Sequence, residues 1–226
     1  MADTSNEESG ESLVGDSRSR FEDKQTRKRP KPGERRVQIL QMLASMLEQP
    51  VGERITTAAL AAKLSVSEAA LYRHFASKAQ MLEGLIEFIE QSIFGLINQI
   101  NDREEASGGA PGEVGLRKVA KIVAMLMQFA ERNPGMARVM VGDALVFENE
   151  RLQARMNQLF DKVEASLRQC LRPVVAEVSD VPTVDTQVQA TVLMAFAVGR
   201  LQRYVRSGFK RLPSEHLDAS MKLMLG

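Results

Sequence analysis

The fold is decided by the stretch Ile55-Thr56-Thr57-Ala58-Ala59-Leu60-Ala61-Ala62-Lys63-Leu64-Ser65-Val66-Ser67-Glu68-Ala69-Ala70-Leu71-Tyr72-Arg73-His74-Phe75-Ala76-Ser77-Lys78. Its apolar and hydroxyl residues are spaced as in two short helices with a tight turn between them. Thr56 or Thr57 can cap the first helix and Ser67 the second, while Val66 places an apolar contact in the turn. This arrangement is typical of a helix-turn-helix, whose second helix enters the major groove of DNA.

Length and composition place this stretch in an all-α protein. The chain has 226 residues, enough for one large or two small domains, and 44% of them are apolar, as in ordinary soluble globular proteins. No region alternates apolar and polar residues for long, whereas apolar residues recur widely at helical spacing. We therefore expect an all-α fold.

Charge is distributed unevenly near the amino terminus, although the whole chain carries only +1. Residues 1–23 contain seven acidic residues and two arginines, which gives −5, and residues 24–36 contain seven cations and one acid, which gives +6. We expect residues 1–33 to form a disordered acidic tail that ends in a basic arm. The arm lies beside the predicted helix-turn-helix, where the phosphates of DNA would be.

Helical periodicity also predicts the rest of the chain. We expect helices over about 34–48, 77–101, 116–131, 136–141, 145–172, 183–207 and 214–225, with a flexible connection over 102–115 and a helix end at Pro173. These elements suggest a helix-turn-helix domain over 34–80 and a helical domain for dimerisation and partner binding over 81–226.

The helix predicted after Ser77 carries one apolar stripe and one aromatic outside it. The stripe contains Leu82, Leu85, Ile86, Ile89, Ile93, Leu96, Ile97 and Ile100. Phe88 lies about 120° from that stripe. It therefore belongs to a second packing face or to an exposed partner site.

Five residues at the two helix starts are candidates for DNA contacts. Thr56 and Thr57 can offer hydroxyl and backbone N–H donors to phosphate. Ser67, Ala69 and Ala70 begin the second helix, where small side chains allow close approach to base edges and an alanine methyl can touch a thymine methyl.

Four residues after the middle of the second helix complete the candidate DNA interface. Tyr72, His74 and Lys78 can donate to phosphates at its far edge, and Arg73 can reach either a phosphate or a guanine edge. For His74, a purely structural role stays open as the alternative.

Catalytic and metal chemistry find little support in the chain. Cys170 is the single cysteine, so an internal disulfide is excluded, and its leucine neighbours favour a buried thiol. No phosphate-binding glycine loop, metal-ligand spacing or nucleophile–base arrangement is recognisable. We expect no enzyme activity, no cofactor and no metal site. A polar amino terminus and the lack of an apolar run of about 18 residues favour a cytoplasmic protein with no membrane partner.

The motif resembles that of the TetR-type regulators. The resemblance rests on Thr57-x-x-Leu60-Ala61, Val66-Ser67 and Leu71-Tyr72-x-His74-Phe75-x-Ser77-Lys78, and it covers about residues 34–82. It implies a homodimer with DNA-binding heads and a C-terminal domain that dimerises through its two long helices. Most members have Gly at the position of Ser65 and Gly-Thr at the position of Ala69-Ala70.

Further segments are similar to the nucleoid-occlusion branch of that family. They are Val66–Phe75, Leu85–Glu90, Glu131–Gly135, Glu150–Gln153, Asn157–Phe160 and Tyr204–Ser207. The similarity implies a protein that binds palindromic chromosomal sites, can spread there as paired dimers, and antagonises polymers of the division protein FtsZ. It also implies that the FtsZ tail binds between the fourth and fifth helices, at Phe88, Arg132 and Asn133. Arg132 could instead serve the C-terminal end of its helix.

A ligand-responsive transcriptional repressor is the alternative function for this fold. In that case a small-molecule pocket would be lined by Met125, Met127, Phe129, Phe160 and Met194. Ordinary core packing would equally explain these five residues. The nucleoid-occlusion interpretation predicts no small-molecule ligand.

Overall fold

The structure, a computed structural model, describes residues 33–49, 55–146, 148–176 and 182–225. All regular elements in these ranges are helices, which confirms the predicted all-α fold. They are α1 (Glu34–Leu47), α2 (Thr57–Lys63), α3 (Glu68–Tyr72), α4 (Lys78–Ser107), α5 (Pro111–Arg132), α6 (Pro134–Met140), the 3-10 helix η1 (Asp143–Leu145), α7 (Glu150–Ala176), α8 (Pro182–Arg206) and α9 (Leu217–Leu225). The predicted acidic tail and most of the basic arm lie outside the described residues.

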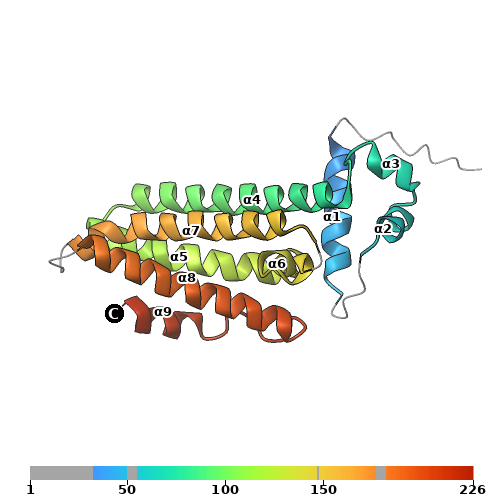
Figure 1. Ribbon diagram of the computed structural model, residues 1–226. Helices are drawn as coiled ribbons and strands as arrows, with labels where there is room; N and C mark the ends of the chain where they lie inside the picture. Colours follow the sequence, from blue (N-terminus) through green and yellow to red (C-terminus); the bar gives the residue numbers. More distant parts are fainter. Residues whose placement is uncertain (1–32, 50–54, 147, 177–181, 226) are drawn as a thin grey trace, which may run out of the picture.

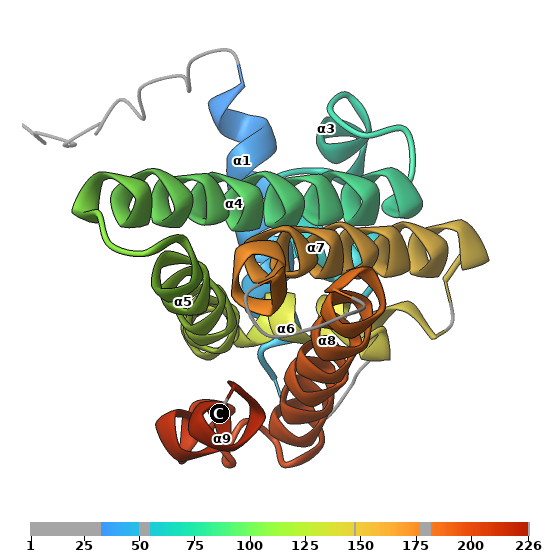
Figure 2. The same cartoon turned by 90° about the vertical axis from the view of Figure 1, so that its left-hand side faces the viewer.

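The helices form an elongated body with a small head at one end (Figure 1). Helices α1, α2 and α3 make the head, and α4 runs from the head along the whole body, so it crosses the domain boundary predicted at residue 80. Seen along the body, α4 lies at the top and α7 directly beneath it, with α5, α6 and α8 further down and α9 at the bottom (Figure 2). In the described part of the chain no helix combines the length and the apolar character needed to cross a membrane.

Helix α5 is the centre of the body because its apolar side chains are buried between α4, α7 and α8. Val119, Ile122, Val123, Leu126 and Met127 are all fully buried. Burying each such side chain contributes about 1.5–3 kcal/mol. This continuous core holds together the body that carries the head.

Cys170 lies where α5 and α7 approach most closely. A side chain at Gly115 would collide with the carbonyl of Cys170, so only glycine permits this approach. The thiol is buried, as predicted, and burial raises its pKa, which keeps it protonated and weakly nucleophilic.

The predicted flexible connection over 102–115 is wrong. Helix α4 continues to Ser107 and α5 begins at Pro111, so only a short turn separates them. The polar residues that suggested a loop are instead paired across the two helices. Glu104, of which 4% is exposed, accepts a hydrogen bond from Nε of Arg117 at 3.0 Å and another from Lys121.

Two smaller expectations about the long helices also fail. Pro173 does not end α7, which continues to Ala176, because a proline near the end of a helix removes only one backbone hydrogen bond and Val175 still reaches the core. Leu96 was expected in the buried stripe of α4, but it is 36% exposed. Its neighbours Ile93 and Ile97 are buried, so Leu96 lies at the solvent-exposed margin of the stripe.

Helix α6 holds the head against the body through α1. Gly135 lies so close to the carbonyl of Ala44 that a Cβ atom has no room. Arg138 donates from Nη1 to the carbonyls of Leu47 at 3.3 Å and Gln49 at 2.7 Å. Its Nε also donates to Asp143 at 2.8 Å. The guanidinium thus satisfies carbonyls that the end of α1 leaves open.

We predict that Gly135→Ala destabilises the protein by about 1–3 kcal/mol, because the new methyl group must push α6 away from α1. The urea midpoint at neutral pH measures this change. Gly95→Ala is the matched control, since a Cβ at Gly95 meets no atom within 4 Å. An equal midpoint for both variants would contradict the close contact.

We also predict that Glu104 makes the stability of the protein fall at acidic pH. The hydrogen bonds from Lys121 and Arg117 lower the pKa of Glu104 below its ordinary value. The ionised Glu104 carboxylate therefore stabilises the fold at neutral pH. This contribution is lost as the pH falls below about 4.3, the ordinary pKa of a glutamate, because the carboxylate becomes protonated. Glu104→Gln should lower the urea midpoint at pH 7 and lose less further stability at pH 3.5 than the wild type.

Glu105→Gln is the control for this prediction, because 69% of the Glu105 side chain is exposed beside Lys118. Its midpoint should stay near that of the wild type at both pH values. A wild-type acid dependence that Glu104→Gln leaves unaltered would overturn the assignment.

Candidate nucleic-acid interface

The two helices of the motif begin as the sequence predicts. The Thr56 hydroxyl accepts the N–H of Ala59 at 3.1 Å, and the Ser67 hydroxyl accepts the N–H of Ala70 at 3.3 Å. A capping hydroxyl uses a lone pair in this bond and keeps its own proton for another acceptor. Thr56 and Ser67 can therefore cap their helices and donate to DNA at the same time.

The turn between α2 and α3 explains an unusual residue. Ser65 has a φ of 53°, in the left-handed region where glycine is favoured, and Val66 donates its N–H to the carbonyl of Ala61 at 3.0 Å. The side chain of Val66 packs against the core of the head. The left-handed turn accounts for the glycine that related motifs carry at this position, and Ser65 adopts it at some cost in stability.

Thr57 belongs to a hydrogen-bond network that sequence reasoning missed. Its hydroxyl donates to a carboxylate oxygen of Glu68 at 2.6 Å and accepts from the hydroxyl of Tyr72 at 3.4 Å. These bonds tie the start of α2 to both ends of α3. The hydroxyl proton of Thr57 is thus used within the head. Its backbone N–H remains as the group that can donate to a phosphate.

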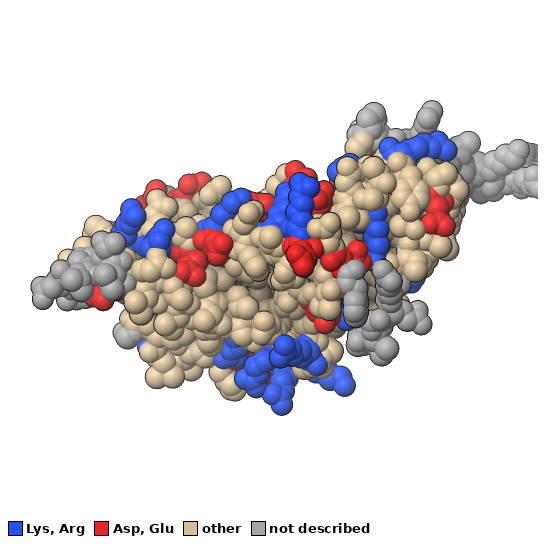
Figure 3. All heavy atoms as spheres, in the orientation of Figure 1, with Lys and Arg blue, Asp and Glu red and all other residues tan. Residues whose placement is uncertain are grey.

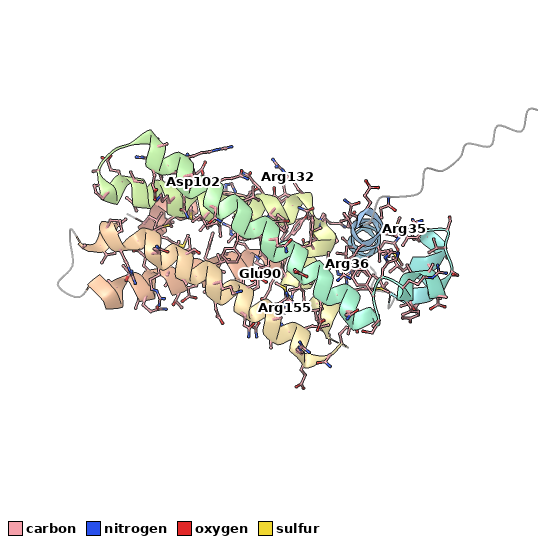
Figure 4. The ribbon with its side chains drawn as sticks, turned by 90° about the horizontal axis from the view of Figure 1, so that it is seen from above. Arg35, Arg36, Glu90, Asp102, Arg132 and Arg155 are labelled. Carbon is pink, nitrogen blue, oxygen red and sulfur yellow. The ribbon has the colours of Figure 1, made fainter. Side chains whose placement is uncertain are left out.

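Arg36 also has a structural role in the head that the sequence did not indicate. Its guanidinium lies 4.1 Å from the ring centroid of Phe75 and donates to the carbonyl of His74 at 2.9 Å. Figure 4 shows Arg35 and Arg36 at the start of α1, beside α2 and α3. The only signal for this contact was its place in the basic block of residues 24–36.

The remaining candidates lie on the exposed surface of α3 and just beyond it. Ala69, Tyr72, Arg73 and His74 are exposed, and Ala70 is half-buried. Small residues thus stand at the start of α3, and a cationic side chain stands at its end. This order matches a helix whose first turn approaches base edges while its last turn approaches the backbone.

Lys78 lies at the boundary between head and body. Its ammonium nitrogen is 2.5 Å from Oε1 of Glu148, a residue just before α7. The structure thus brings together two residues that are far apart in the sequence. Lys78 is already paired where the predicted DNA contact would form.

A second surface lies on the edge between α4 and α5, near the head. The two helices are antiparallel and are joined by the short turn between Ser107 and Pro111. Residues equally far from this turn therefore lie level with each other, and Ile86 and Arg132 are each 21 residues away from it. Arg132 is therefore level with the part of α4 that carries Phe88, which is 36% exposed. Asn133 joins α5 to α6, and its side-chain amide donates to the carbonyl of Phe129 at 2.8 Å.

The two edges of α4 differ in their charges. On the side of α7, Glu90 pairs with Arg155 at 4.0 Å and with Lys162, so this edge is closed by ion pairs. Arg132 lies on the opposite side of α4 (Figure 4) and forms no ion pair with any described residue. The edge of Phe88, Arg132 and Asn133 is thus the one with an unpaired cation beside an exposed aromatic ring.

Other cations lie away from the head. Figure 3 shows Lys and Arg side chains gathered below the end of α8. The last turn of α8 and the following loop carry Arg203, Arg206, Lys210 and Arg211, all exposed. Positive charge at the C-terminal end of a helix is favourable. The described residues of the head carry cations of their own, Arg35, Arg36, Lys63 and Arg73.

The five residues of the predicted small-molecule pocket lie in the core. Met127, Phe129 and Met194 are buried, and Met125 and Phe160 are partly buried against the same cluster. A cavity of about 570 Å³ does lie between α4, α5 and α7, and Asn101, Gln169 and Cys170 are among its lining residues. It contains none of the five.

Comparisons with known proteins agree with this architecture. Residues 53–85 match the family of bacterial regulatory proteins of the tetR type, and residues 114–225 match a SlmA-like model described as a tetracyclin repressor-like C-terminal domain. The chain is 16% identical to the solved structure of the fatty acid degradation regulator FadR from Bacillus halodurans, with a TM-score of 0.69 over 87% of this chain and 97% of that one. That likeness shows the fold.

Sequence relatives are much closer. The nucleoid occlusion factor SlmA of Idiomarina loihiensis is 50% identical over 190 residues, which cover 84% of this chain and 93% of the relative. The same factor of Shewanella amazonensis is 50% identical over 81% of this chain and 89% of that relative. The chain therefore belongs to the SlmA family of nucleoid occlusion factors, within the TetR-type DNA-binding regulators.

Proposed function

We propose that this protein is a nucleoid-associated inhibitor of cell division, which binds chromosomal palindromes and, when bound, antagonises FtsZ polymers over the nucleoid. The observation that carries the proposal is 50% identity to nucleoid occlusion factors across both the head and the body. The DNA-binding head locates the activity on the chromosome, and the α4–α5 edge acts on the division protein in the cytoplasm.

The DNA-binding half rests on the geometry of α2 and α3. Thr56 and Ser67 have hydroxyl protons available for phosphates, and Ala69 and Ala70 allow the start of α3 to approach base edges. Arg73, His74, Tyr72 and Lys78 contact the backbone at the far edge of the groove. Thr57 contributes through its backbone N–H, because its hydroxyl holds Glu68.

A homodimer places two such heads on one palindrome. The exposed face of α8 carries Val188, Val192, Ala195 and Gly199 at helical spacing, with Val188 57% and Val192 50% exposed. An apolar stripe of this kind, beside α7, suits a self-complementary interface between two copies. Half-sites should then lie about one helical turn, ~34–36 Å, apart or slightly more.

The partner-binding half rests on Phe88, Arg132 and Asn133. An exposed aromatic ring beside an unpaired arginine suits a peptide that carries both an apolar anchor and a carboxylate. The FtsZ tail is the peptide we assign to this edge. Asn133 holds the junction between α5 and α6 in place beneath it.

The alternative, a ligand-responsive repressor, has weaker support. Its pocket would need space among five residues that pack in the core instead. We therefore expect no small molecule to be needed for DNA release.

We predict that the protein, saturated with a duplex that it selects from random-sequence DNA, disassembles FtsZ filaments in sedimentation and light-scattering assays. Phe88→Ala and Arg132→Glu should each weaken binding of an FtsZ tail peptide about tenfold or more, because each removes an anchor. Both variants should keep wild-type DNA affinity.

Arg103→Glu is the matched control, since it reverses an exposed charge near the far end of α4, 15 residues from Phe88. This variant should disassemble filaments like the wild type. Filaments that stay intact with wild-type protein at saturating DNA would contradict the proposed activity, and a loss of activity shared by Arg103→Glu would contradict the proposed binding edge.

We also predict a division of roles within the head. Lys78→Ala should weaken all DNA sequences similarly and reduce the slope of log affinity against log salt by about 1, because it removes one phosphate contact. Ala69 or Ala70 substitutions should instead change base preference in a selection from random DNA. If Lys78→Ala changed preference and left overall affinity intact, this division would be wrong.

A further inference from the structure

Lys78 occupies an unfavourable place for a cation. It is the first residue of α4, after the N-cap Ser77, and the N–H groups of a helix start create a positive potential there. An anion close by offsets this unfavourable potential. In the absence of DNA, that anion is Glu148.

The pair is more than a loose surface contact. The ammonium nitrogen of Lys78 lies 2.5 Å from Oε1 of Glu148, and only 24% and 14% of the two side chains are exposed. Partial burial reduces screening by salt, which strengthens the attraction relative to exposed pairs. The next ion pair along α4 and α7, Glu83 with Arg151 at 3.9 Å, is separate. Lys78 and Glu148 therefore depend mainly on each other.

We propose that Glu148 competes with a DNA phosphate for the ammonium of Lys78 and thereby lowers the affinity of the protein for DNA from outside the DNA interface. The inference rests on the proposed phosphate contact of Lys78. A phosphate drawn to this ammonium brings a second anion beside the Glu148 carboxylate, and like charges repel. DNA binding must therefore loosen or break the pair.

The competition also connects DNA to the body. The N–H of Glu148 donates to the carbonyl of Leu145 in η1 at 3.0 Å, and α7 begins two residues later. Release of Lys78 thus changes the electrostatic surroundings of the start of α7. Because such coupling is reciprocal, whatever strengthens the pair weakens DNA binding by the same factor.

The test is a double-mutant cycle on DNA affinity, measured by fluorescence anisotropy with a duplex selected by the wild-type protein. Glu148→Gln should bind this duplex roughly two- to fivefold more tightly than the wild type at low salt, because the competing charge is gone. Lys78→Met should bind more weakly. In the Lys78→Met background, Glu148→Gln should no longer increase DNA affinity more than the removal of any nearby negative charge does.

Glu150→Gln is the matched control. Glu150 is an exposed acid in the first turn of α7, two residues from Glu148, and pairs with no cation among the described residues. It reports the effect of removing one negative charge near DNA without touching Lys78. The gain of Glu148→Gln must exceed that of Glu150→Gln.

The outcomes separate the inference from the proposed function. If Lys78→Met weakens binding and Glu148→Gln matches Glu150→Gln or binds more weakly than the wild type, Lys78 contacts DNA and Glu148 does not compete. If Lys78→Met binds like the wild type, the phosphate contact itself fails, and the inference fails with it. Should Glu148→Gln have a lowered urea midpoint, Glu148→Asp gives the test: a shorter carboxylate should bind DNA more tightly than the wild type.

Discussion

The contact between α1 and α6 is the constraint on which the rest of the molecule depends. Gly135 lets the backbone of α6 lie against the carbonyl of Ala44, and Arg138 takes up the carbonyls of Leu47 and Gln49. Because α2 and α3 are held on α1, the position of α1 on the body sets where α3 points. A rigid body built around α5 thus presents the recognition helix in a defined direction, which a dimer needs in order to match two half-sites.

The proposed partner-binding edge lies at this same joint. Asn133 begins α6, whose next turn touches α1, and Arg132 and Phe88 lie on the edge beside it. On the side of α7, Lys78 begins α4 and pairs with Glu148, just before α7. Besides the packing of α1 on α4, the head is therefore held on the body by two contacts of different kinds, one formed by close backbone packing and one by charge. Only the second can respond to a phosphate.

Local features were the ones that could be predicted from sequence. The caps at Thr56, Ser67 and Ser77 depend on neighbours three residues away, and the structure confirms all three. The buried pairing of Glu104 with Arg117 and Lys121 could not be predicted, because it joins two helices and makes a polar stretch helical. The Thr57–Glu68 bond and the Lys78–Glu148 pair needed the fold for the same reason. Phe88 could be singled out because it lies outside an apolar stripe, but its position level with Arg132 depends on the antiparallel packing of α4 and α5.

The central claim is that DNA binding localises an inhibitor of division over the chromosome. Genome-wide occupancy of the protein in growing cells, measured by chromatin immunoprecipitation, tests it most directly. The account predicts many palindromic sites spread over the chromosome and absent around the replication terminus, where division must be allowed. Occupancy confined to one or two promoters would contradict it and would favour a conventional transcriptional repressor.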